Sequence, residues 1–449
     1  MRSPKWWLSL AAGAMLAAVF PPFDLPWLLM PVAVALWFHC TRDVPLRTVL
    51  WRSLAFAMGF YLLLLKWMLV VGIDAWILLA LLQSLYFLIV AVVRHRMAGR
   101  NWELLSIALA WSAQDWLRDH APFAAFGWGQ LAFASIDAPW SQFAAYGGQI
   151  VVTALAALTG LALARMFAGS FPRRLIGLGT LVLALSVPLL LPTNTPGSGV
   201  RLALVQGGVD HTGLGFIGDR NAVLYRHRDL TEQTLRNTDV GAVVWPENAS
   251  DADPFTDPNA ARALHDAANA AGKPILFGAV LTGPDGRRNV SMIAYPFRTE
   301  FEVVYQKQRL VPFGEFLPFR DFLTRVTDRV EFLPIDFLPG NDPATLRIRG
   351  NDIGIVICFE VADQDLVGAA LASGETALIV QTNNATYAGT GQSEQQLRIA
   401  QFRARSFGRP VYVISTNGPT AVITEHGDVV ERVVEGDTGV LYTSVVAHA

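Results

Sequence analysis

The feature that most constrains the fold is a series of long apolar segments before about residue 192. Several of them approach the roughly 20 residues that a helix needs to cross about 30 Å of hydrocarbon. The pattern predicts seven membrane spans, at 6–20, 25–40, 48–71, 73–93, 102–117, 142–164 and 174–192. Charged residues make up only 16% of the 449-residue chain, which excludes a disordered or an ordinary cytosolic protein.

Basic residues set the expected orientation of these spans, because cytoplasmic loops retain Lys and Arg. They occur before the first span and in every second loop after it: Arg2, Lys5, Arg42, Arg47, Arg94, Arg96, Arg100, Arg165, Arg173 and Arg174. The first span ends at Val19-Phe20-Pro21-Pro22 without a small-residue cleavage site, so we expect an anchor and not a cleaved signal peptide. The amino terminus is therefore predicted to be cytoplasmic and, because seven is odd, everything after residue 192 extracytoplasmic.

A change of composition divides the chain into a membrane domain at 1–192, a polar linker at 193–199, a second domain at 200–445 and a tail at 446–449. In the second domain, strand patterns alternate with helical patterns, and strands such as 377–380 are apolar on both faces. The domain is therefore predicted to be a layered α/β sandwich. Its strands are expected at 200–206, 241–246, 274–281, 289–296, 300–306, 353–358, 376–382, 411–416 and 420–424, and its helices at 218–236, 258–271, 361–373 and 392–407.

Several function classes lack their sequence patterns. The chain has no Gly-rich phosphate loop, no His/Cys cluster with metal spacing and no basic stripe, so we expect no metal, no cofactor and no nucleic-acid partner. Its two cysteines, Cys40 and Cys358, are expected on opposite sides of the bilayer, which excludes a disulfide between them.

Three residues of the second domain suggest thiol acyl chemistry. Cys358 and Glu247 each follow an apolar strand directly, and Lys307 comes after another predicted strand. A thiol attacks a carbonyl as thiolate, so its proton needs a base, for which Glu247 is the candidate. A lysine cation would stabilise the developing oxyanion. A lone cysteine is also often a buried hydrophobe and a lysine after a strand is often solvated, so the chemistry alone leaves a structural interpretation open.

The motifs around these residues resemble a known family. Trp245-Pro246-Glu247, the run from Lys307 to Glu315, and Ile357-Cys358-Phe359-Glu360 look like the three signatures of the nitrilase superfamily, whose domain is an α-β-β-α sandwich. Seven spans before such a domain, with Phe20-Pro21-Pro22-Phe23-Asp24 between the first two, resemble the apolipoprotein N-acyltransferase family of the bacterial inner membrane. The resemblance covers nearly the whole chain.

The resemblance implies a reaction and a set of residues. A membrane phospholipid would donate an acyl chain to Cys358, and the resulting thioester would be attacked by the α-amine of the diacylglyceryl-modified cysteine of an apolipoprotein. Glu247 would be the general base and Lys307 the electrostatic stabiliser. Supporting residues of the active site would be Glu315, Phe359, Glu360, Asn383 and Asn384. Residues at the substrate entrance would be Trp116, Arg118 and Trp128, and we add Phe332 and Phe337 as an apolar lip at the membrane surface.

Simpler interpretations exist for the supporting residues. Glu315 could pair with Arg309 or Arg320 at the surface, Glu360 could be structural, and Asn383 and Asn384 could shape a turn. The chain also departs from the family twice: position 359 is Phe where many members have Tyr, and the chain stops at 445–449 without the usual eighth span. We expect either a lineage without that span or a truncated chain.

Two other functions remain open at this stage. A membrane-anchored amidase of the nitrilase type would use the same three residues but pass the acyl group to water. A transporter or lipid-binding protein is the second alternative. It is disfavoured because it would not need Glu247, Lys307 and Cys358 together. The lipid-facing half disfavours the first alternative, because a hydrolase of small soluble amides needs at most one anchor.

Overall fold

The computed structural model describes residues 5–120, 126–168, 170–191, 201–209, 221–236, 238–318, 320–325 and 335–443. The chain forms two compact units. The helical unit comprises Met1–Thr193 and Thr390–Arg398, and the α/β unit comprises Asn194–Gly389 and Ile399–Ala449. The predicted linker 193–199 and tail 446–449 lie outside the described residues.

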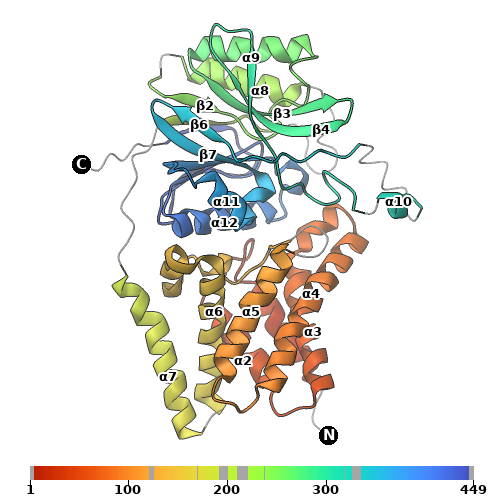
Figure 1. Cartoon of the computed structure of the whole chain (residues 1–449), viewed down its shortest axis with the longest axis vertical. Coiled ribbons are helices and arrows are strands. Elements are labelled where there is room, and N and C mark those ends of the chain that lie inside the picture. The colour runs from red at the N-terminus through yellow and green to blue at the C-terminus, as the bar shows by residue number, and fades with distance from the viewer. Residues whose placement is uncertain are drawn as a thin grey trace. The chain divides into compact units, whose positions relative to one another are not determined.

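The helical unit contains a helix at each predicted span (Figure 1). Among the described residues its α-helices are α1 (Trp6–Ala17), α2 (Leu29–Cys40), α3 (Leu46–Leu64), α4 (Ile73–Arg96), α5 (Glu103–His120), α6 (Ala144–Ala168) and α7 (Phe171–Ser186). Short 3₁₀ helices lie between or after them: η1 (Lys66–Val70), η2 (Phe133–Ser135), η3 (Pro139–Phe143) and η4 (Val187–Leu190). α6 is kinked at Gly148, whose φ of 58° suits glycine.

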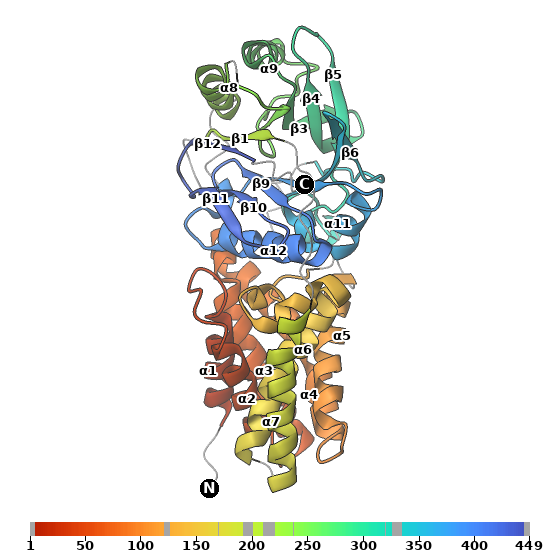
Figure 2. The same cartoon turned by 90° about the vertical axis from the view of Figure 1, so that its left-hand side faces the viewer.

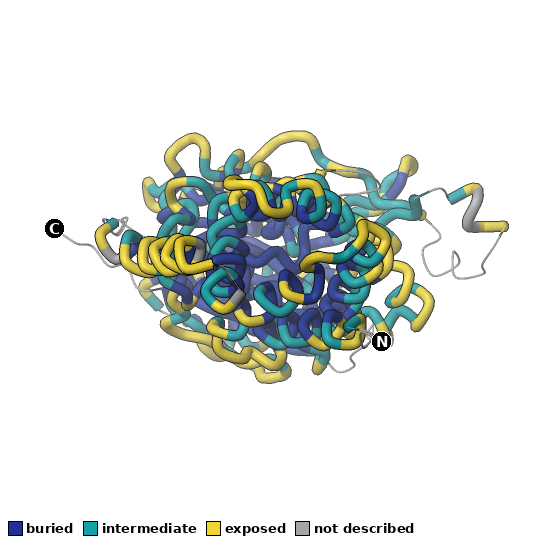
Figure 3. Tube along the Cα trace, turned by 90° about the horizontal axis from the view of Figure 1, so that it is seen from below, coloured by how far each residue is buried: buried dark blue, intermediate teal, exposed yellow. Residues whose placement is uncertain are grey.

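Among the described residues, two helical segments are long and apolar enough to cross a membrane, Ile73–Arg96 and Pro139–Phe167. Shorter apolar helices cover Trp6–Ala17, Leu29–Cys40 and Arg174–Ser186. The membrane-spanning role of all seven helices therefore stays a prediction. Large apolar side chains are nevertheless exposed along α4, at Ile73, Ile77, Leu78, Leu81, Leu82, Leu85 and Ile89. Figure 3 colours the trace by burial and shows exposed positions along the outer sides of helices.

The α/β unit contains two six-stranded sheets (Figure 2). The first sheet has the strand order β12-β1-β2-β3-β4-β5, formed by Gly439–Tyr442, Leu202–Gln206, Ala242–Val244, Ile275–Gly283, Gly286–Ala294 and Phe301–Gln306. The second has the order β11-β10-β9-β8-β7-β6, formed by Val429–Val433, Thr420–Ile423, Val411–Ser415, Ala377–Thr382, Asn351–Ile357 and Thr345–Ile348. β1, β2 and β3 run parallel, as do β7, β8 and β9.

The alternation of side chains along the strands builds the layers. In β1, Leu202 and Leu204 face a core that also holds Ile353, Ile355 and Ile357 of β7, so this core lies between the sheets. The intervening β1 residues face a second core on the outer side of the first sheet, formed with α8 (Ala222–Thr234) and α9 (Pro258–Ala271). On the second sheet lie α11 (Gln364–Ala370) and the C-terminal part of α12 (Gln392–Phe407) (Figure 2). The predicted layered α/β sandwich is confirmed.

The structure corrects some element boundaries. All nine predicted strands occur, but β6, β11 and β12 were not predicted. The helix expected at 361–373 begins as a 3₁₀ turn, η7 (Cys358–Ala362), and continues as α11. Asp363 separates the two because its carboxylate accepts the Asp365 and Leu366 amides as an N-cap of α11. The other short elements are α10 (Arg320–Leu323) and η8 (Ala385–Tyr387). Residues 390–398, which composition placed with 200–445, group with the helical unit.

Candidate active site

The candidate nucleophile, base and cation all come just after the carboxyl ends of strands. Glu247 follows β2 by three residues, Lys307 follows β5 directly, and Cys358 follows β7 directly. β2 and β5 belong to the first sheet and β7 to the second. The structure therefore brings the three side chains together where the two sheets end, as ligand sites of α/β folds generally are.

Cys358 occupies a constrained turn. Its φ is 54°, in the left-handed region that non-glycine residues rarely adopt. Such strain persists only where the surroundings enforce it, and it is common at functional sites. The side chain packs against the core between the sheets, beside Ile357. The turn thus projects a thiol from the end of a strand whose last five residues are buried.

Glu360 holds that turn in place. Its carboxylate accepts hydrogen bonds from the Ile357 amide (2.7 Å), the Gln308 amide (2.6 Å), the Arg309 amide (2.9 Å) and the Tyr305 hydroxyl (2.9 Å). Burial raises the pKa of Glu360 to about 7, although the backbone donors oppose the rise. The same carboxylate therefore ties the nucleophile turn to the loop that begins at Lys307.

Lys307 lies between two carboxylates. Its Nζ is 3.1 Å from Glu247 Oε1 and 2.8 Å from Glu315 Oε1, and its side chain is only 1% exposed. Burial alone would lower the pKa of Lys307, but Glu247 and Glu315 hold it well above its usual value. The lysine therefore stays protonated and supplies a fixed positive charge beside the thiol.

Glu247 is oriented from both sides. Asn289 Nδ2 donates to Glu247 Oε1 at 2.7 Å, and the backbone amide of Asn383 donates to Oε2 at 2.8 Å. Close approach of β3 also matters, because a Cβ on Gly278 would lie 2.6 Å from the Glu247 Cα. The carboxylate is thus fixed by these donors and by Lys307, which it shares with Glu315.

The thiol of Cys358 donates a hydrogen bond to Glu247, and it is protonated at neutral pH. Burial, first, and the Glu247 charge, second, raise its pKa to about 12, and Lys307 opposes the rise. A thiol in this state is a poor nucleophile until a base removes its proton. The arrangement suits a reaction in which Glu247 takes the proton as the sulfur attacks.

The other predicted supporting residues have distinct positions. Glu315 bridges Lys307 and Asn289, and its second oxygen accepts the Val311 amide at 2.8 Å. Asn383 contributes its backbone amide to Glu247. Asn384 Oδ1 accepts from the hydroxyls of Thr382 (2.7 Å) and Ser415 (3.1 Å), which shapes the turn after β8. Phe359 is partly buried in the first turn of η7.

Two residues near the site were missed from the sequence. Asn289 lies inside β4 and donates to both Glu247 and Glu315, but an asparagine within a strand pattern gives no warning of this. Tyr387 lies at the end of η8, and burial with the nearby Cys358 charge raises its pKa to about 12. The run from Asn383 to Ala385 was noted for its asparagines, so the tyrosine two residues later could have been included.

The predicted entrance residues do not share one environment. In the helical unit, Trp116 is 48% exposed, whereas Arg118 and Trp128 are buried. Phe337, in the α/β unit, is partly buried, and its amide donates to the Glu315 carbonyl at 2.7 Å. Phe332 lies outside the described residues. An entrance role for the other four stays a prediction.

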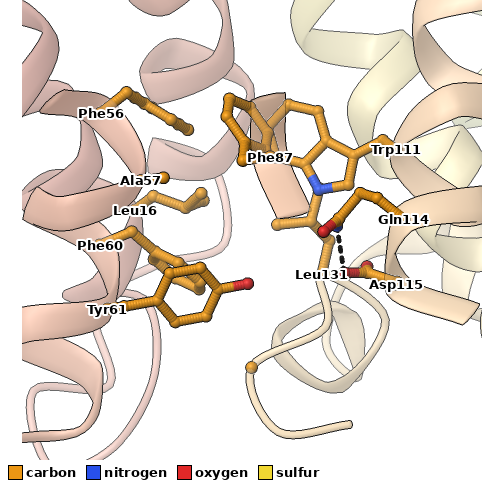
Figure 4. A pocket seen from close by; sticks show the side chains of 11 residues that line it. Leu16, Phe56, Ala57, Phe60, Tyr61, Phe87, Trp111, Gln114, Asp115 and Leu131 are labelled. Atoms are coloured by element: carbon orange, nitrogen blue, oxygen red, sulfur yellow. Dashed lines mark hydrogen bonds between the residues drawn. The ribbon is translucent and has the colours of Figure 1, made fainter. Parts of the chain in front are cut away.

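Arg118 is the centre of a polar network in the helical unit. It donates to Asp115 Oδ1 (2.7 Å), Gln83 Oε1 (2.9 Å) and the carbonyl of Trp128 (2.9 Å). Asp115 is also bonded to Gln114, and both line a small pocket of mainly apolar side chains that include Tyr61 (Figure 4). Buried charged groups need partners, which this network supplies.

Acidic, histidine and cysteine side chains of the described residues form no group that could hold a metal ion. Cys40 and Cys358 are not in disulfides.

Comparison with known proteins gives consistent family matches. Residues 12–162 match the family model of the apolipoprotein N-acyltransferase N-terminal domain. The chain is 32% identical to an apolipoprotein N-acyltransferase of Mycolicibacterium smegmatis, covering 95% of this chain and 77% of the relative. It is 28% identical to one of Pseudomonas syringae pv. tomato, covering 98% and 90%. An amidase from Nesterenkonia sp. is a structural match with a TM-score of 0.41 and 20% identity, over 56% of this chain and 92% of the amidase.

Proposed function

This chain belongs to the apolipoprotein N-acyltransferase family, and we propose that it transfers an acyl chain from a membrane phospholipid to the α-amine of a diacylglyceryl-modified cysteine of an apolipoprotein. In this proposal Cys358 is the nucleophile, Glu247 the general base and Lys307 the stabilising cation. Their hydrogen-bonded arrangement supports these roles, because each has the partner that its chemistry needs.

The first half-reaction makes a thioester. Glu247 takes the Cys358 proton while Sγ attacks the ester carbonyl of the phospholipid, and a tetrahedral oxyanion forms. Lys307 stabilises that negative charge. As the oxyanion collapses, the carbon–oxygen bond of the ester breaks, and protonated Glu247 returns its proton to the leaving oxygen. The products are an acyl-thioester on Cys358 and a lysophospholipid.

The second half-reaction makes an amide. The neutral α-amine of the acceptor cysteine attacks the thioester carbonyl and gives a proton to Glu247. The carbon–sulfur bond then breaks, and protonated Glu247 restores the Cys358 thiol. One carboxylate thus takes and returns one proton in each half-reaction. Because the lysophospholipid leaves before the acceptor amine attacks the acyl-thioester, ping-pong kinetics follow.

We place the helical unit across the inner membrane, with the amino terminus cytoplasmic and the α/β unit extracytoplasmic. The row of exposed apolar side chains on α4 supports a lipid-facing helix, since soluble proteins rarely expose such a stripe. The basic loops support the orientation. Trp116 and Phe337 are then candidates for contact with the acyl chains. Replacing Phe332 and Phe337 by serine is expected to raise the phospholipid concentration needed for half-maximal rate.

The observation that carries the proposal is the bond of the Cys358 thiol to Glu247, which itself is bonded to Lys307. The test is the intact mass of detergent-purified protein after incubation with phosphatidylethanolamine vesicles. We expect a hydroxylamine-labile gain of one acyl chain, absent from Cys358→Ala. The proposal would be contradicted if no acyl adduct formed on the protein and the phospholipid remained intact. Release of free fatty acid, in place of transfer to an acceptor peptide, would indicate a hydrolase.

A further inference from the structure

The stretch Phe20-Pro21-Pro22-Phe23-Asp24, which drew attention in the sequence, has no part in the chemistry above. Its residues contact the segment Thr390–Arg398, which belongs to the helical unit although its chain neighbours belong to the α/β unit. We call Thr390–Arg398 the docked segment. The residues that hold it, which we call the docking site, are Pro21, Pro22, Asp24, Leu64, Trp67, Trp128 and Asp137.

Gln395 is the centre of the docked segment. Its Oε1 accepts hydrogen bonds from the indole nitrogens of Trp67 (3.2 Å) and Trp128 (2.7 Å). Its Nε2 donates to the carbonyls of Pro21 (2.8 Å) and Leu64 (3.1 Å). The side chain is buried, and all four bonds use the full donor and acceptor capacity of a carboxamide.

Two further contacts flank Gln395. Gly391 has a φ of +86°, and a Cβ at that position would lie 2.7 Å from the Pro22 ring, so only glycine fits. Arg398 donates through one nitrogen to both carboxylate oxygens of Asp24 (2.8 Å each) and through the other to Asp137 (3.0 Å). An apolar contact, four hydrogen bonds and an ionic contact therefore fix the N-terminal part of α12 and the residue before it.

The docked segment follows closely on the turn that orients the general base. Only six residues separate Thr390 from Asn383, whose amide donates to Glu247. Those residues form consecutive tight turns, in which Ala385 N donates to Asn383 Oδ1 (3.2 Å) and Tyr387 N to the Asn384 carbonyl (2.9 Å). A displacement at Gln395 is therefore transmitted over a short, internally bonded stretch of chain.

We propose that Gln395 is a positioning residue, which through its docking site fixes the Asn383 turn and so the orientation of Glu247. This inference rests on the proposed function, in which Glu247 is the base. Trp128 and the Phe20–Asp24 stretch thereby gain a role that needs no contact with substrate. The network of Arg118 supports the same site, since Arg118 binds the Trp128 carbonyl.

The test uses the full-length protein and the variant Gln395→Met, which keeps the volume and removes all four hydrogen bonds. Gln401→Met is the matched control, because Gln401 lies on the same helix and donates to the Gly427 carbonyl at 2.8 Å within the α/β unit. Two rates are measured below the unfolding temperature. One is thioester formation from phosphatidylethanolamine vesicles, and the other is alkylation of Cys358 by iodoacetamide between pH 7 and 10.

We expect Gln395→Met to slow thioester formation about tenfold, as misplaced catalytic groups do. Alkylation should become faster, and its pH profile should shift toward that of Glu247→Gln. The reason is that a less firmly held Glu247 carboxylate raises the pKa of the Cys358 thiol less, so more thiolate forms. Gln401→Met should leave both rates near those of the unchanged protein. Gln395→Glu retains the acceptor but turns a carboxylate toward two carbonyls, so it should not restore the rate.

Arg398→Ala provides a variant whose folding is not in question, since Asp24 and Asp137 are exposed, and it should show the same two effects at smaller size. Unchanged alkylation and acylation in both Gln395→Met and Arg398→Ala would overturn the inference, as would equal effects in Gln401→Met. Slower acylation with an unchanged alkylation profile would also overturn it. Failure of the proposed function can be distinguished from failure of this inference, because in the first case the unchanged protein itself would form no thioester.

Discussion

The candidate active site and the Arg118 network both bury charged side chains, but these charges are satisfied to different extents. In the α/β unit, Lys307 donates to two carboxylates, and Glu360 accepts four hydrogen bonds. In the helical unit, the Arg118 network leaves Arg118 Nε, Asp115 Oδ2 and Gln114 Oε1 without a partner among the described residues. In the proposed function the charges near the thiol serve the chemistry, whereas the helical network mainly holds helices and the Trp128 loop, at some cost in stability.

The largest expected effect that would test this contrast comes from Glu247→Gln. Removing the base should slow thioester formation about 10³-fold, in the range usual for general-base catalysis. The Cys358 pKa, raised to about 12 by burial first and by Glu247 second, should fall. Since the thiolate is the reactive form, alkylation by iodoacetamide at pH 8 should become faster while acyl transfer is lost. Intact mass spectrometry measures both.

The control for Glu247→Gln is Glu302→Gln, an exposed position on β5. Alkylation of the unchanged protein should rise steadily with pH between 8 and 10, because a thiol with its pKa near 12 stays mostly protonated there. A plateau near pH 9, or slower alkylation in Glu247→Gln, would contradict the assigned charge environment of Cys358.

The next effect concerns the stability of the helical unit. Arg118→Met removes the partner of the buried Asp115 and should lower the free energy of unfolding by about 3 kcal/mol. The additional change Asp115→Asn should recover part of that loss, because no uncompensated charge remains. Thermal unfolding in detergent measures this, with the exposed Arg47→Met as control. Equal losses from Arg118→Met and Arg47→Met would remove the contrast between buried and surface charge.

The parts of the fold that the sequence predicted are those with strong periodic patterns. Ile353, Ile355 and Ile357 alternate into the core between the sheets, so β7 and the position of Cys358 at its end were predictable. β11 was missed because it is short and largely exposed, and its sequence Val-Val-Glu-Arg-Val does not alternate between apolar and polar residues. Local patterns do not report pairing with a distant strand, and β12 exists because it pairs with β1.

Candidate site residues could be predicted from the sequence where a polar side chain follows a strand. They could not be predicted where a polar residue, which the sequence suggests is exposed, is buried in the structure. Glu247, Lys307 and Cys358 belong to the first kind. Gln395 belongs to the second: the polar run Gln392–Gln396 has the composition of a solvent-facing helix surface, yet Gln395 is buried and accepts hydrogen bonds from two indoles. Only the tertiary structure supplies the four partners that make such burial favourable.

A smaller effect is expected at Glu360, which positions Cys358 without meeting it in a proton transfer. In Glu360→Gln, an amide NH₂ group would replace one of the carboxylate oxygens that now accept hydrogen bonds from backbone amides. Donor would then face donor, so the turn that holds Cys358 should loosen. Thioester formation should slow about tenfold. Glu375→Gln is the matched control, because Glu375 is buried and accepts the Ser373 amide at 3.0 Å away from the site. An equal loss of activity in that control would assign Glu360 a general structural role only.

The smallest expected effect concerns the hydroxyl group near the thiol. Position 359 carries no hydroxyl in this chain, but Tyr387 lies near enough for the Cys358 charge to contribute to its raised pKa, after burial. Tyr387→Phe removes one hydrogen-bond donor from this region and should slow thioester formation about threefold, as one neutral hydrogen bond would. The double variant with Phe359→Tyr should recover the rate if a hydroxyl from position 359 reaches the same region. Tyr412→Phe, a buried tyrosine of β9, is the control, and an unchanged rate in Tyr387→Phe would show that the hydroxyl has no part in the reaction.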